Sequence, residues 1–314
     1  MTVGELGEFG VVGRIAGRLS HSASVLLGPG DDAAVLAAPD RRVVVTTDLL
    51  LEGRHFRRDW SSGYEIGRKA AAQNLSDIVA MGATPTGLFV GLGMPADTPI
   101  AWLDELTDGF RDECGLVGTS VAGGDIASSP MIVLGVTALG DLGGIAPITR
   151  SGARPGDQVA VAGRLGYAAA GLALLSGGVA VDSFEELLRA HRRPEPPYAE
   201  GPRAAALGAT AMMDVSDGLV QDLGHIAKAS GTGIVLEPDS FHVPALLGAA
   251  AAYLGVDPLD WILTGGEDHA LAAVFPPEVR LPPEWRIVGE VVPGQNVQVK
   301  GRAEAPGGWD HFRG

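Results

Sequence analysis

Residues 41–81 read RRVVVTTDLLLEGRHFRRDWSSGYEIGRKAAAQNLSDIVAM, and they combine a predicted strand with a predicted helix. The valine run in Arg41–Thr47 predicts a strand whose valines are buried. After a loop, the apolar spacing from about Tyr64 to Met81 predicts a helix with one side against a core. The side chains expected to face that core are Ile66, Ala70 and Ile78.

The same mixture of elements continues along the chain. A second amphipathic helix is expected at Ile100–Cys114, followed by a strand within residues 131–140. A further strand is expected at Gln158–Ala162, a helix at Tyr167–Leu175, a proline-rich crossover at residues 191–203 and another helix after Asp217. The later strands are GIVLE, ALAAVF and RIVGEVV. Strands and helices mixed in both halves predict an α/β or α+β architecture.

Length and local composition predict two domains. The chain has 314 residues and 46% hydrophobic content, which suits two domains better than one. Residues 149–158, TRSGARPGDQ, combine proline, glycine and charge without apolar periodicity. We therefore expect domains at residues 1–148 and 149–314.

Charge and cysteine content narrow the possible partners and the compartment. The formal net charge is -15, which disfavours nucleic acid and anionic membranes as partners. The single cysteine, Cys114, cannot form an internal disulfide and is expected to be buried. The N-terminus carries acidic residues where an export signal is positive, and the uncharged stretch Leu165–Val181 is too short for a membrane span. These features predict a soluble cytoplasmic protein.

Seven aspartates are expected at turns or strand ends, where both oxygens of a carboxylate can face a shared cleft. They are Asp31, Asp32, Asp48, Asp77, Asp125, Asp214 and Asp217. Carboxylates in such positions are typical of Mg²⁺ sites completed by substrate phosphates. Each one alone is explained equally well by the preference of aspartate for turns and helix N-caps. Asp48 and Asp214 each end an apolar run, where a cap is not required.

The familiar nucleotide-binding motifs are absent from the sequence. The three lysines, Lys69, Lys228 and Lys300, do not fit a P-loop, and the kinase motifs HRD and DFG do not occur. The GLG at residues 91–93 lacks the third glycine of a dinucleotide fingerprint. If the protein uses ATP, it uses a different scaffold.

Eight blocks of the sequence, in order, resemble those of the thiamine-monophosphate kinase family, within the superfamily of aminoimidazole ribonucleotide synthetase and selenophosphate synthetase. The blocks are GDDAAVL (30–36), TTDLLLEGRHF (46–56), KAAAQNLSDIVAMGATP (69–85), GGD (123–125), TRSGARPGD (149–157), DVSDGLVQDLGHIAKASG (214–231), TGGEDHAL (264–271) and GWDHF (308–312). The resemblance runs from about Gly4 to Phe312. It implies a two-domain, synthetase-like α/β (α+β) fold, with an N-terminal domain that forms a homodimer and a C-terminal domain that closes over the nucleotide.

The resemblance also implies an activity and a set of site residues. The activity is Mg²⁺-dependent transfer of the γ-phosphoryl group of ATP to thiamine monophosphate. The implied metal ligands are Asp32, Thr46, Thr47, Asp48, Asp77, Asp125, Asp214 and Asp217. The implied ATP contacts are Gly124, Asp125, Arg150 and Ser216, and the implied contacts to thiamine monophosphate are His55, Glu267 and Trp309.

This activity requires no catalytic general base. A phosphate monoester carries a charge of about -1.5 to -2 at neutral pH, so its attacking oxygen is already deprotonated. Donor and acceptor repel each other, and several Mg²⁺ ions are needed to bridge them. Arg150 would supply the fixed positive charge that a lysine supplies in other folds.

Simpler roles remain open for several of these residues. Asp217 could cap the helix that follows it, and His55 could lie in a surface loop. Glu267 and Asp31 could be turn residues, and Trp309 could anchor the end of the chain instead of stacking on the thiazolium cation.

The sequence departs from the family at two positions. Pro29 stiffens the GPGDD loop, and His269 stands where the family often has tyrosine.

Two other functions are considered. A selenophosphate synthetase would carry a reactive cysteine near its N-terminus, and Cys114 does not fit that place. A non-catalytic relative would lack one of the aspartates, and none is missing.

Overall fold

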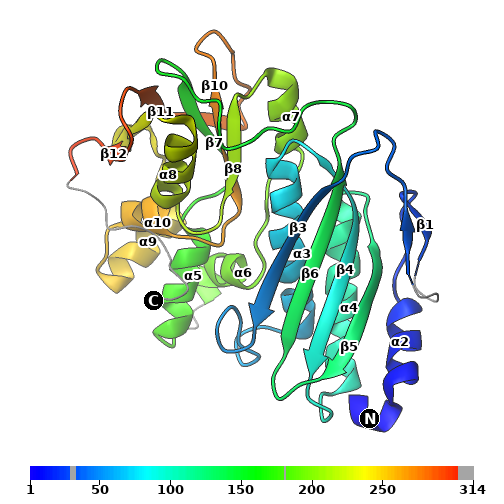
Figure 1. The fold of residues 1–314 in the computed structure, drawn as a ribbon. Helices are drawn as coiled ribbons and strands as arrows, with labels where there is room; N and C mark the ends of the chain where they lie inside the picture. The colour runs from blue at the N-terminus through cyan, green and yellow to red at the C-terminus, as the bar shows by residue number, and fades with distance from the viewer. Residues whose placement is uncertain (29–32, 180–181, 303–314) are drawn as a thin grey trace. The chain divides into compact units, whose positions relative to one another are not determined.

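The computed structural model describes residues 1–28, 33–179 and 182–302 (Figure 1). The chain forms two compact units, one of residues 1–78 and 83–146 and the other of residues 79–82 with the chain from 147 onward. Each unit contains a sheet and helices, which confirms the predicted two-domain α/β class.

The first unit is built on a four-stranded sheet with the strand order β3-β6-β4-β5. β6 pairs antiparallel with β3 and β4, and β5 pairs parallel with β4. Helices α3 and α4 lie behind this sheet in Figure 1. The elements are α1 (Val3–Leu6), α2 (Glu8–Ala16), β1 (Val25–Leu27), β2 (Val35–Leu36), β3 (Val44–Leu51), α3 (Gly63–Ala80), β4 (Thr84–Met94), α4 (Ile100–Leu116), β5 (Val121–Ser128) and β6 (Val133–Asp141).

Glycines let α3 and α4 approach each other closely. A Cβ atom on Gly67 of α3 would lie 2.2 Å from the carbonyl oxygen of Leu106, and one on Gly109 of α4 would lie 2.2 Å from that of Tyr64. The predicted core side of α3 is confirmed, because Ile66, Ala70 and Ile78 are fully buried. Cys114 of α4 is also buried, as expected, and burial raises the pKa of its thiol to about 12.

The predicted burial of the valine run is wrong. Val43 and Val45 are 47% and 59% exposed, and Leu49 of the same strand is 61% exposed. Side chains alternate along β3, so Thr46, Asp48 and Leu50 face the other, more buried side. One face of the strand is thus left uncovered by the residues that the structure describes.

The second unit contains a six-stranded sheet in the order β12-β9-β11-β7-β10-β8. One apolar cluster joins strand residues such as Val161 and Val215 to Leu223 and Ile226 of α8, and a second joins Ala162 and Phe275 to residues including Ala204 of α7. The elements are β7 (Gln158–Ala162), α5 (Tyr167–Ser176), η1 (Asp182–Phe184), α6 (Glu185–Arg192), α7 (Glu200–Leu207), β8 (Ala211–Val215), α8 (Leu219–Ser230), β9 (Gly233–Leu236), η2 (Pro238–Ser240), α9 (Ala245–Leu254), α10 (Pro258–Thr264), β10 (Ala270–Phe275), β11 (Trp285–Val292) and β12 (Val297–Val299).

The end of α3 belongs to the second unit, which the predicted division of the chain did not foresee. Val79 and Ala80 pack in the same cluster as Ile148 and Ala204. Gly201 of α7 lies so close to Val79 that a Cβ atom there would be 2.0 Å from the carbonyl oxygen of Val79. Backbone contact between the two helices therefore accounts for this assignment.

Some segments contain more regular structure than predicted. Residues 191–203 were expected to be a proline-rich crossover, but they include the end of α6 and the start of α7. Pro202 is tolerated there because it lies in the first turn of α7, where backbone N–H groups need no helical partner. Residues 91–93, the isolated GLG, lie inside β4.

In the part of the chain that the structure describes, no single helix has both the length and the apolar character needed to cross a membrane. The helices α9 and α10 meet that test only as a pair, which is bent by 110°.

We predict that Gly67→Ala destabilises the protein although alanine favours helices. The added methyl group meets the Leu106 carbonyl oxygen, and forced overpacking costs about 1–3 kcal/mol. Gly115→Ala in α4 is the matched control, because no atom lies within 4 Å of its Cβ position and alanine gains about 0.5–1 kcal/mol over glycine in a helix. Urea unfolding of both variants checks this, and equal stabilisation by both changes would show that the two helices tolerate a wider spacing.

Candidate active site

Three of the predicted aspartates lie inside regular elements instead of at turns or strand ends: Asp48 in β3, Asp77 in α3 and Asp125 in β5. Asp214 lies one residue before the end of β8, close to the expected strand end. The expected end of the strand near Asp48 is wrong, because the pairing of β3 with β6 continues through the next three residues. These carboxylates are therefore held by the regular backbone of the two sheets and of α3.

Thr46, Asp48 and Asp77 form the first group of candidate residues. The Thr46 hydroxyl donates to Oδ2 of Asp77 at 2.6 Å, which joins β3 to α3. Asp48 lies two residues after Thr46, so both side chains point to the same face of the sheet. The structure thus places a hydroxyl and two carboxylates on one side of β3.

Thr47 points to the opposite face. Its hydroxyl donates to the carbonyl oxygen of Val136 at 3.0 Å and accepts from the Thr137 hydroxyl at 3.1 Å. The alternation of side chains along a strand separates it from Thr46 and Asp48. The structure therefore does not bring Thr47 to the side of the sheet that carries those two side chains.

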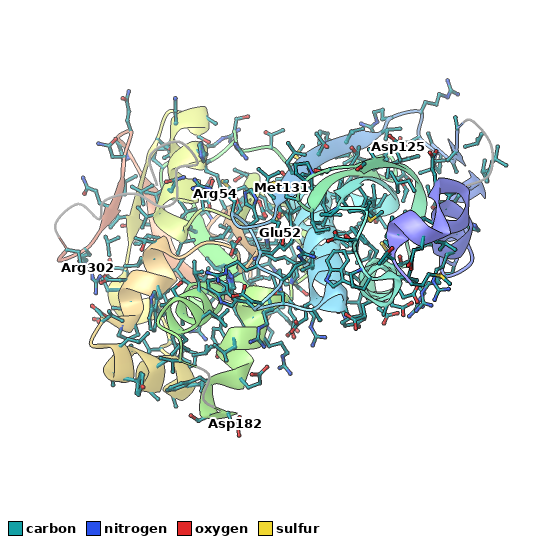
Figure 2. The ribbon with its side chains drawn as sticks, turned by 90° about the horizontal axis from the view of Figure 1, so that it is seen from below. Glu52, Arg54, Asp125, Met131, Asp182 and Arg302 are labelled. Carbon is teal, nitrogen blue, oxygen red and sulfur yellow. The ribbon has the colours of Figure 1, made fainter. Side chains whose placement is uncertain are left out.

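Gly124 and Asp125 lie on β5, at the other edge of the sheet from β3. Because two strands separate β3 from β5, Asp48 and Asp125 are about 14 Å apart at the usual spacing of about 4.8 Å. Figure 2 likewise shows Asp125 apart from the turn after β3 that carries Glu52 and Arg54. A Cβ atom on Gly124 would lie 2.2 Å from the Val90 carbonyl oxygen, so this position needs glycine.

His55 follows β3 in the same turn as Arg54. Its Nδ1 accepts the Leu51 N–H at 2.9 Å, and the residue is half-buried. This bond fixes the ring against the end of the strand, so His55 is not a fully exposed loop residue.

In the second unit, residues 214–218 and 264–269 lie side by side. β8 and β10 pair antiparallel, and the segments that extend from them remain hydrogen-bonded. The Glu267 N–H donates to the Ser216 carbonyl oxygen at 2.8 Å, and the His269 N–H donates to that of Val215 at 3.1 Å. Nδ1 of His269 also lies 2.9 Å from Oδ2 of Asp214. Asp214 and Ser216, predicted from one block of sequence, and Glu267, predicted from another, are thus brought together.

This contact depends on glycine and on unusual backbone angles. A Cβ atom on Gly266 would lie 2.2 Å from the Ser216 carbonyl oxygen, and one on Gly218 would lie 2.5 Å from that of Thr264. Glu267 and His269 have φ angles of 66° and 52°, in the left-handed region that side chains disfavour. Strained non-glycine residues cluster at functional sites.

Asp217 lies one residue before Gly218, which is the N-cap residue of α8 and makes no side-chain capping bond. A capping role for the Asp217 side chain stays a prediction. Oδ2 of Asp222 instead accepts the N–H groups of both Asp217 and Gly218, at 3.0 and 3.1 Å. Burial raises the pKa of Asp222 to about 7, and the charges of Asp214 and Asp217 act in the same direction.

Asp222 was missed because its partners are backbone groups. An acidic residue in the first turn of a predicted helix, four positions after the N-cap, was the only signal in the sequence.

Arg150 and Glu267 each have a neighbour that the sequence did not indicate. The carbonyl oxygen of Arg150 accepts from the Ser230 hydroxyl of α8 at 3.3 Å. Nδ1 of His191, which is buried in α6, lies 3.1 Å from Oε2 of Glu267. Glu267 is therefore held by a backbone bond on one side and lies beside a histidine on the other.

No three His, Cys, Asp or Glu residues within residues 1–28, 33–179 and 182–302 are grouped closely enough to hold a metal ion by themselves. Among the aspartates, the substrate contacts and the departures from the family named in the sequence analysis, four residues lie outside the described residues. They are Pro29, Asp31, Asp32 and Trp309.

We predict that Asp268→Asn weakens the pH dependence of stability. Asp268 is buried, its Oδ1 accepts the Ala168 N–H at 2.9 Å, and burial raises its pKa to about 7. In the unfolded chain an aspartate ionises near pH ~3.9, so the free energy of unfolding falls as pH rises from there to about 7. Asparagine resembles the neutral acid and does not ionise. Thermal unfolding should therefore show a smaller fall in Tm between pH 5 and pH 8 for the variant, and an equal fall would contradict the assignment.

Comparison with known proteins agrees with this arrangement in two units. Residues 30–142 match the N-terminal domain of AIR synthase related proteins, and residues 154–302 match the C-terminal domain. A relative from Mycobacterium tuberculosis named thiamine-monophosphate kinase is 49% identical over 99% of this chain and 93% of its own length.

Two solved structures also resemble the whole chain. The thiamine-monophosphate kinase of Stenotrophomonas maltophilia has a TM-score of 0.83 and 33% identity, covering 95% of this chain and 98% of that one. A structure described as AaThiL complexed with AMPPCP and TMP has a TM-score of 0.81 and 32% identity, covering 99% of each chain. This chain therefore belongs to the thiamine-monophosphate kinase family and contains both AIR synthase related domains.

Proposed function

We propose that this protein transfers the γ-phosphoryl group of ATP to thiamine monophosphate, giving thiamine diphosphate and ADP. The observation that carries the proposal is the likeness along 99% of the chain to a protein solved with thiamine monophosphate and AMPPCP, an analogue of ATP. The 49% identity to a thiamine-monophosphate kinase supports the same reaction.

The contacts in the second unit support the proposed substrate residues. Ser216 is assigned to ATP and Glu267 to thiamine monophosphate, and a 2.8 Å backbone bond joins them. Arg150 is exposed, so its guanidinium can reach a phosphate. Gly124 and Asp125 are assigned to ATP, and His55 and Trp309 to the acceptor.

The residues present fit Mg²⁺ by ligand type. Thr46, Asp48 and Asp77 offer hard oxygen atoms on one face of β3, and Asp214 and Asp217 offer carboxylates in the second unit. Mg²⁺ is usually held by one or two carboxylates together with substrate phosphates and water, so a cluster of three protein ligands is not required. The bound ions would neutralise the charge that donor and acceptor phosphates bring together. The assigned ligands are Asp32, Thr46, Thr47, Asp48, Asp77, Asp125, Asp214 and Asp217.

The chain's own residues then act by positioning and by charge. The attacking phosphate oxygen of the acceptor is already deprotonated at neutral pH, so no side chain has to remove a proton. Arg150 would hold developing negative charge in a fixed place, and Glu267 would orient the acceptor. We therefore assign no residue as a catalytic general base.

A second copy of this chain is the proposed partner in addition to the substrates. Val45 and Leu49 are 59% and 61% exposed on the uncovered face of β3, at the edge of the first sheet. Exposed apolar side chains gathered on one face mark an interaction surface. We assign dimerisation to residues 1–148. We assign the cytoplasm as the compartment because the single cysteine, Cys114, cannot form an internal disulfide, which suits a reducing environment.

The reaction is tested by incubating purified protein with ATP, Mg²⁺ and thiamine monophosphate and separating the thiamine esters by chromatography. We expect thiamine diphosphate and ADP in equal amounts, and no ADP when the acceptor is left out. Formation of ADP without thiamine diphosphate would overturn the proposal and point to another reaction of the same superfamily.

We predict that Asp77→Asn lowers turnover by orders of magnitude and leaves the unfolding temperature nearly unchanged. The asparagine carbonyl oxygen can still accept the Thr46 hydroxyl, which lies 2.6 Å from Asp77, but it has no charge to attract a cation. Steady-state kinetics and thermal unfolding check the two parts. A variant that unfolds at lower temperature and retains its specific activity would show that Asp77 serves the fold alone.

We predict that Leu49→Asp converts a dimer into a monomer. A charge on the apolar face of β3 would be buried without a partner if a second copy covers that face. Leu116→Asp is the control, because Leu116 is 63% exposed at the end of α4 in the same unit. Light scattering after gel filtration measures the mass of each variant. The same mass for Leu49→Asp as for the parent protein would reject this interface.

A further inference from the structure

We propose that Asp222 is a positioning residue that fixes the direction of the Asp217 side chain, an inference that rests on the proposed function. Asp222 is 1% exposed and lies in the first turn of α8. One atom, Oδ2, accepts both the Asp217 N–H at 3.0 Å and the Gly218 N–H at 3.1 Å. The two peptide groups on either side of Asp217 Cα are thereby held by a single oxygen atom.

The backbone around Asp217 is fixed from a second direction. The carbonyl oxygen of Ser216, the preceding residue, accepts the Glu267 N–H at 2.8 Å. Gly218, the following residue, has a φ of 124° and would place a Cβ atom 2.5 Å from the Thr264 carbonyl oxygen. The peptide of residues 216–218 therefore has little freedom to rotate, and the Cα–Cβ bond of Asp217 leaves it in one direction.

Asp222 bonds the start of α8 as the acid of a capping box does. In that motif an acidic side chain in the first turn of a helix accepts the backbone N–H of the N-cap residue. Here Gly218 is the N-cap residue, and the Asp222 carboxylate accepts its N–H group and that of the preceding residue, Asp217.

The test compares substitutions at Asp222 by their effect on Mg²⁺-dependent nucleotide binding. Asp222→Asn can place its carbonyl oxygen where Oδ2 lies, and one oxygen accepts both bonds, so the geometry is kept without the charge. Asp222→Ala removes the acceptor, and Asp222→Glu keeps the charge but moves the oxygen by one methylene group. Binding of ATP is measured by calorimetry across a Mg²⁺ titration, together with kcat, the KM for ATP and the unfolding temperature.

We expect the Ala and Glu variants to need about 10–100-fold more Mg²⁺ for half-maximal nucleotide binding, the usual loss when a residue that orients a metal ligand is removed. The Asn variant should stay within about twofold of the parent protein, because both backbone bonds remain. Asp157→Ala is the control for lost stability, since Asp157 is also buried in the second unit and its carboxylate accepts the Arg154 N–H at 2.9 Å. This control should lower the unfolding temperature without changing the Mg²⁺ dependence.

Three outcomes would overturn the inference. The first is an Asp222→Ala variant that loses stability only, as the Asp157→Ala control does. If Asp222→Ala does not fold, the Asn and Glu variants decide. The second outcome is an Asn variant with impaired Mg²⁺ dependence beside a normal Glu variant. It would show that the charge of Asp222 matters and the position of its oxygen does not. The third is an Asp217→Asn variant with impaired Mg²⁺ dependence beside a normal Asp222→Ala variant, which rejects the inference alone. A normal Asp217→Asn variant would instead reject the metal role of Asp217 in the proposed function.

Discussion

The hydrogen bond from the Glu267 N–H to the Ser216 carbonyl oxygen is the contact on which the candidate site in the second unit depends. It continues the antiparallel pairing of β8 with β10 beyond the ends of both strands. The backbones approach so closely that Gly218 and Gly266 cannot carry side chains. The strained angles at Glu267 and His269 are the conformational cost of this approach, of order 1–3 kcal/mol for each residue.

The burial of acidic side chains is the second constraint on the structure of the site. Asp214, Asp222 and Asp268 are all buried in the second unit, although a buried carboxylate is unfavourable without a partner. Backbone N–H groups serve Asp222 and Asp268, and a histidine serves Asp214. These partners arrange the chain around Asp217 and Glu267, which are proposed to meet cation and substrate. Asp214 is itself one of the proposed metal ligands.

The sequence predicted the fold where apolar periodicity was strong. The strand Gln158–Ala162 and the core side of α3 were predicted correctly, because burial alone determines which residues can occupy them. Helix α7 was missed because residues 191–203 were read as a proline-rich crossover, although the first turn of a helix tolerates proline. Burial of the valine run was predicted wrongly, since the pattern of a strand does not tell whether its second face is covered within the same chain.

The site was predicted less completely, because sequence blocks give residue types without their surroundings. The blocks named Asp214, Ser216 and Glu267, which the fold brings together, but they also named Thr46 and Thr47, which point to opposite faces of β3. Asp222 was not named at all, because its bonds to the N–H groups of Asp217 and Gly218 cannot be read from residue order. His269 was noted only as a departure from the family, and its contact with Asp214 depends on a left-handed backbone angle that the sequence does not reveal.

The central claim is that the phosphoryl group passes directly from ATP to the phosphate of thiamine monophosphate, with charge and position supplied by the protein and no side chain attacking the donor. The stereochemical course at phosphorus tests this most directly, using ATP whose γ-phosphorus is made chiral with three oxygen isotopes. A single in-line displacement predicts inversion of configuration in the terminal phosphate of thiamine diphosphate. Retention would indicate two displacements through a phosphorylated side chain and would contradict the account.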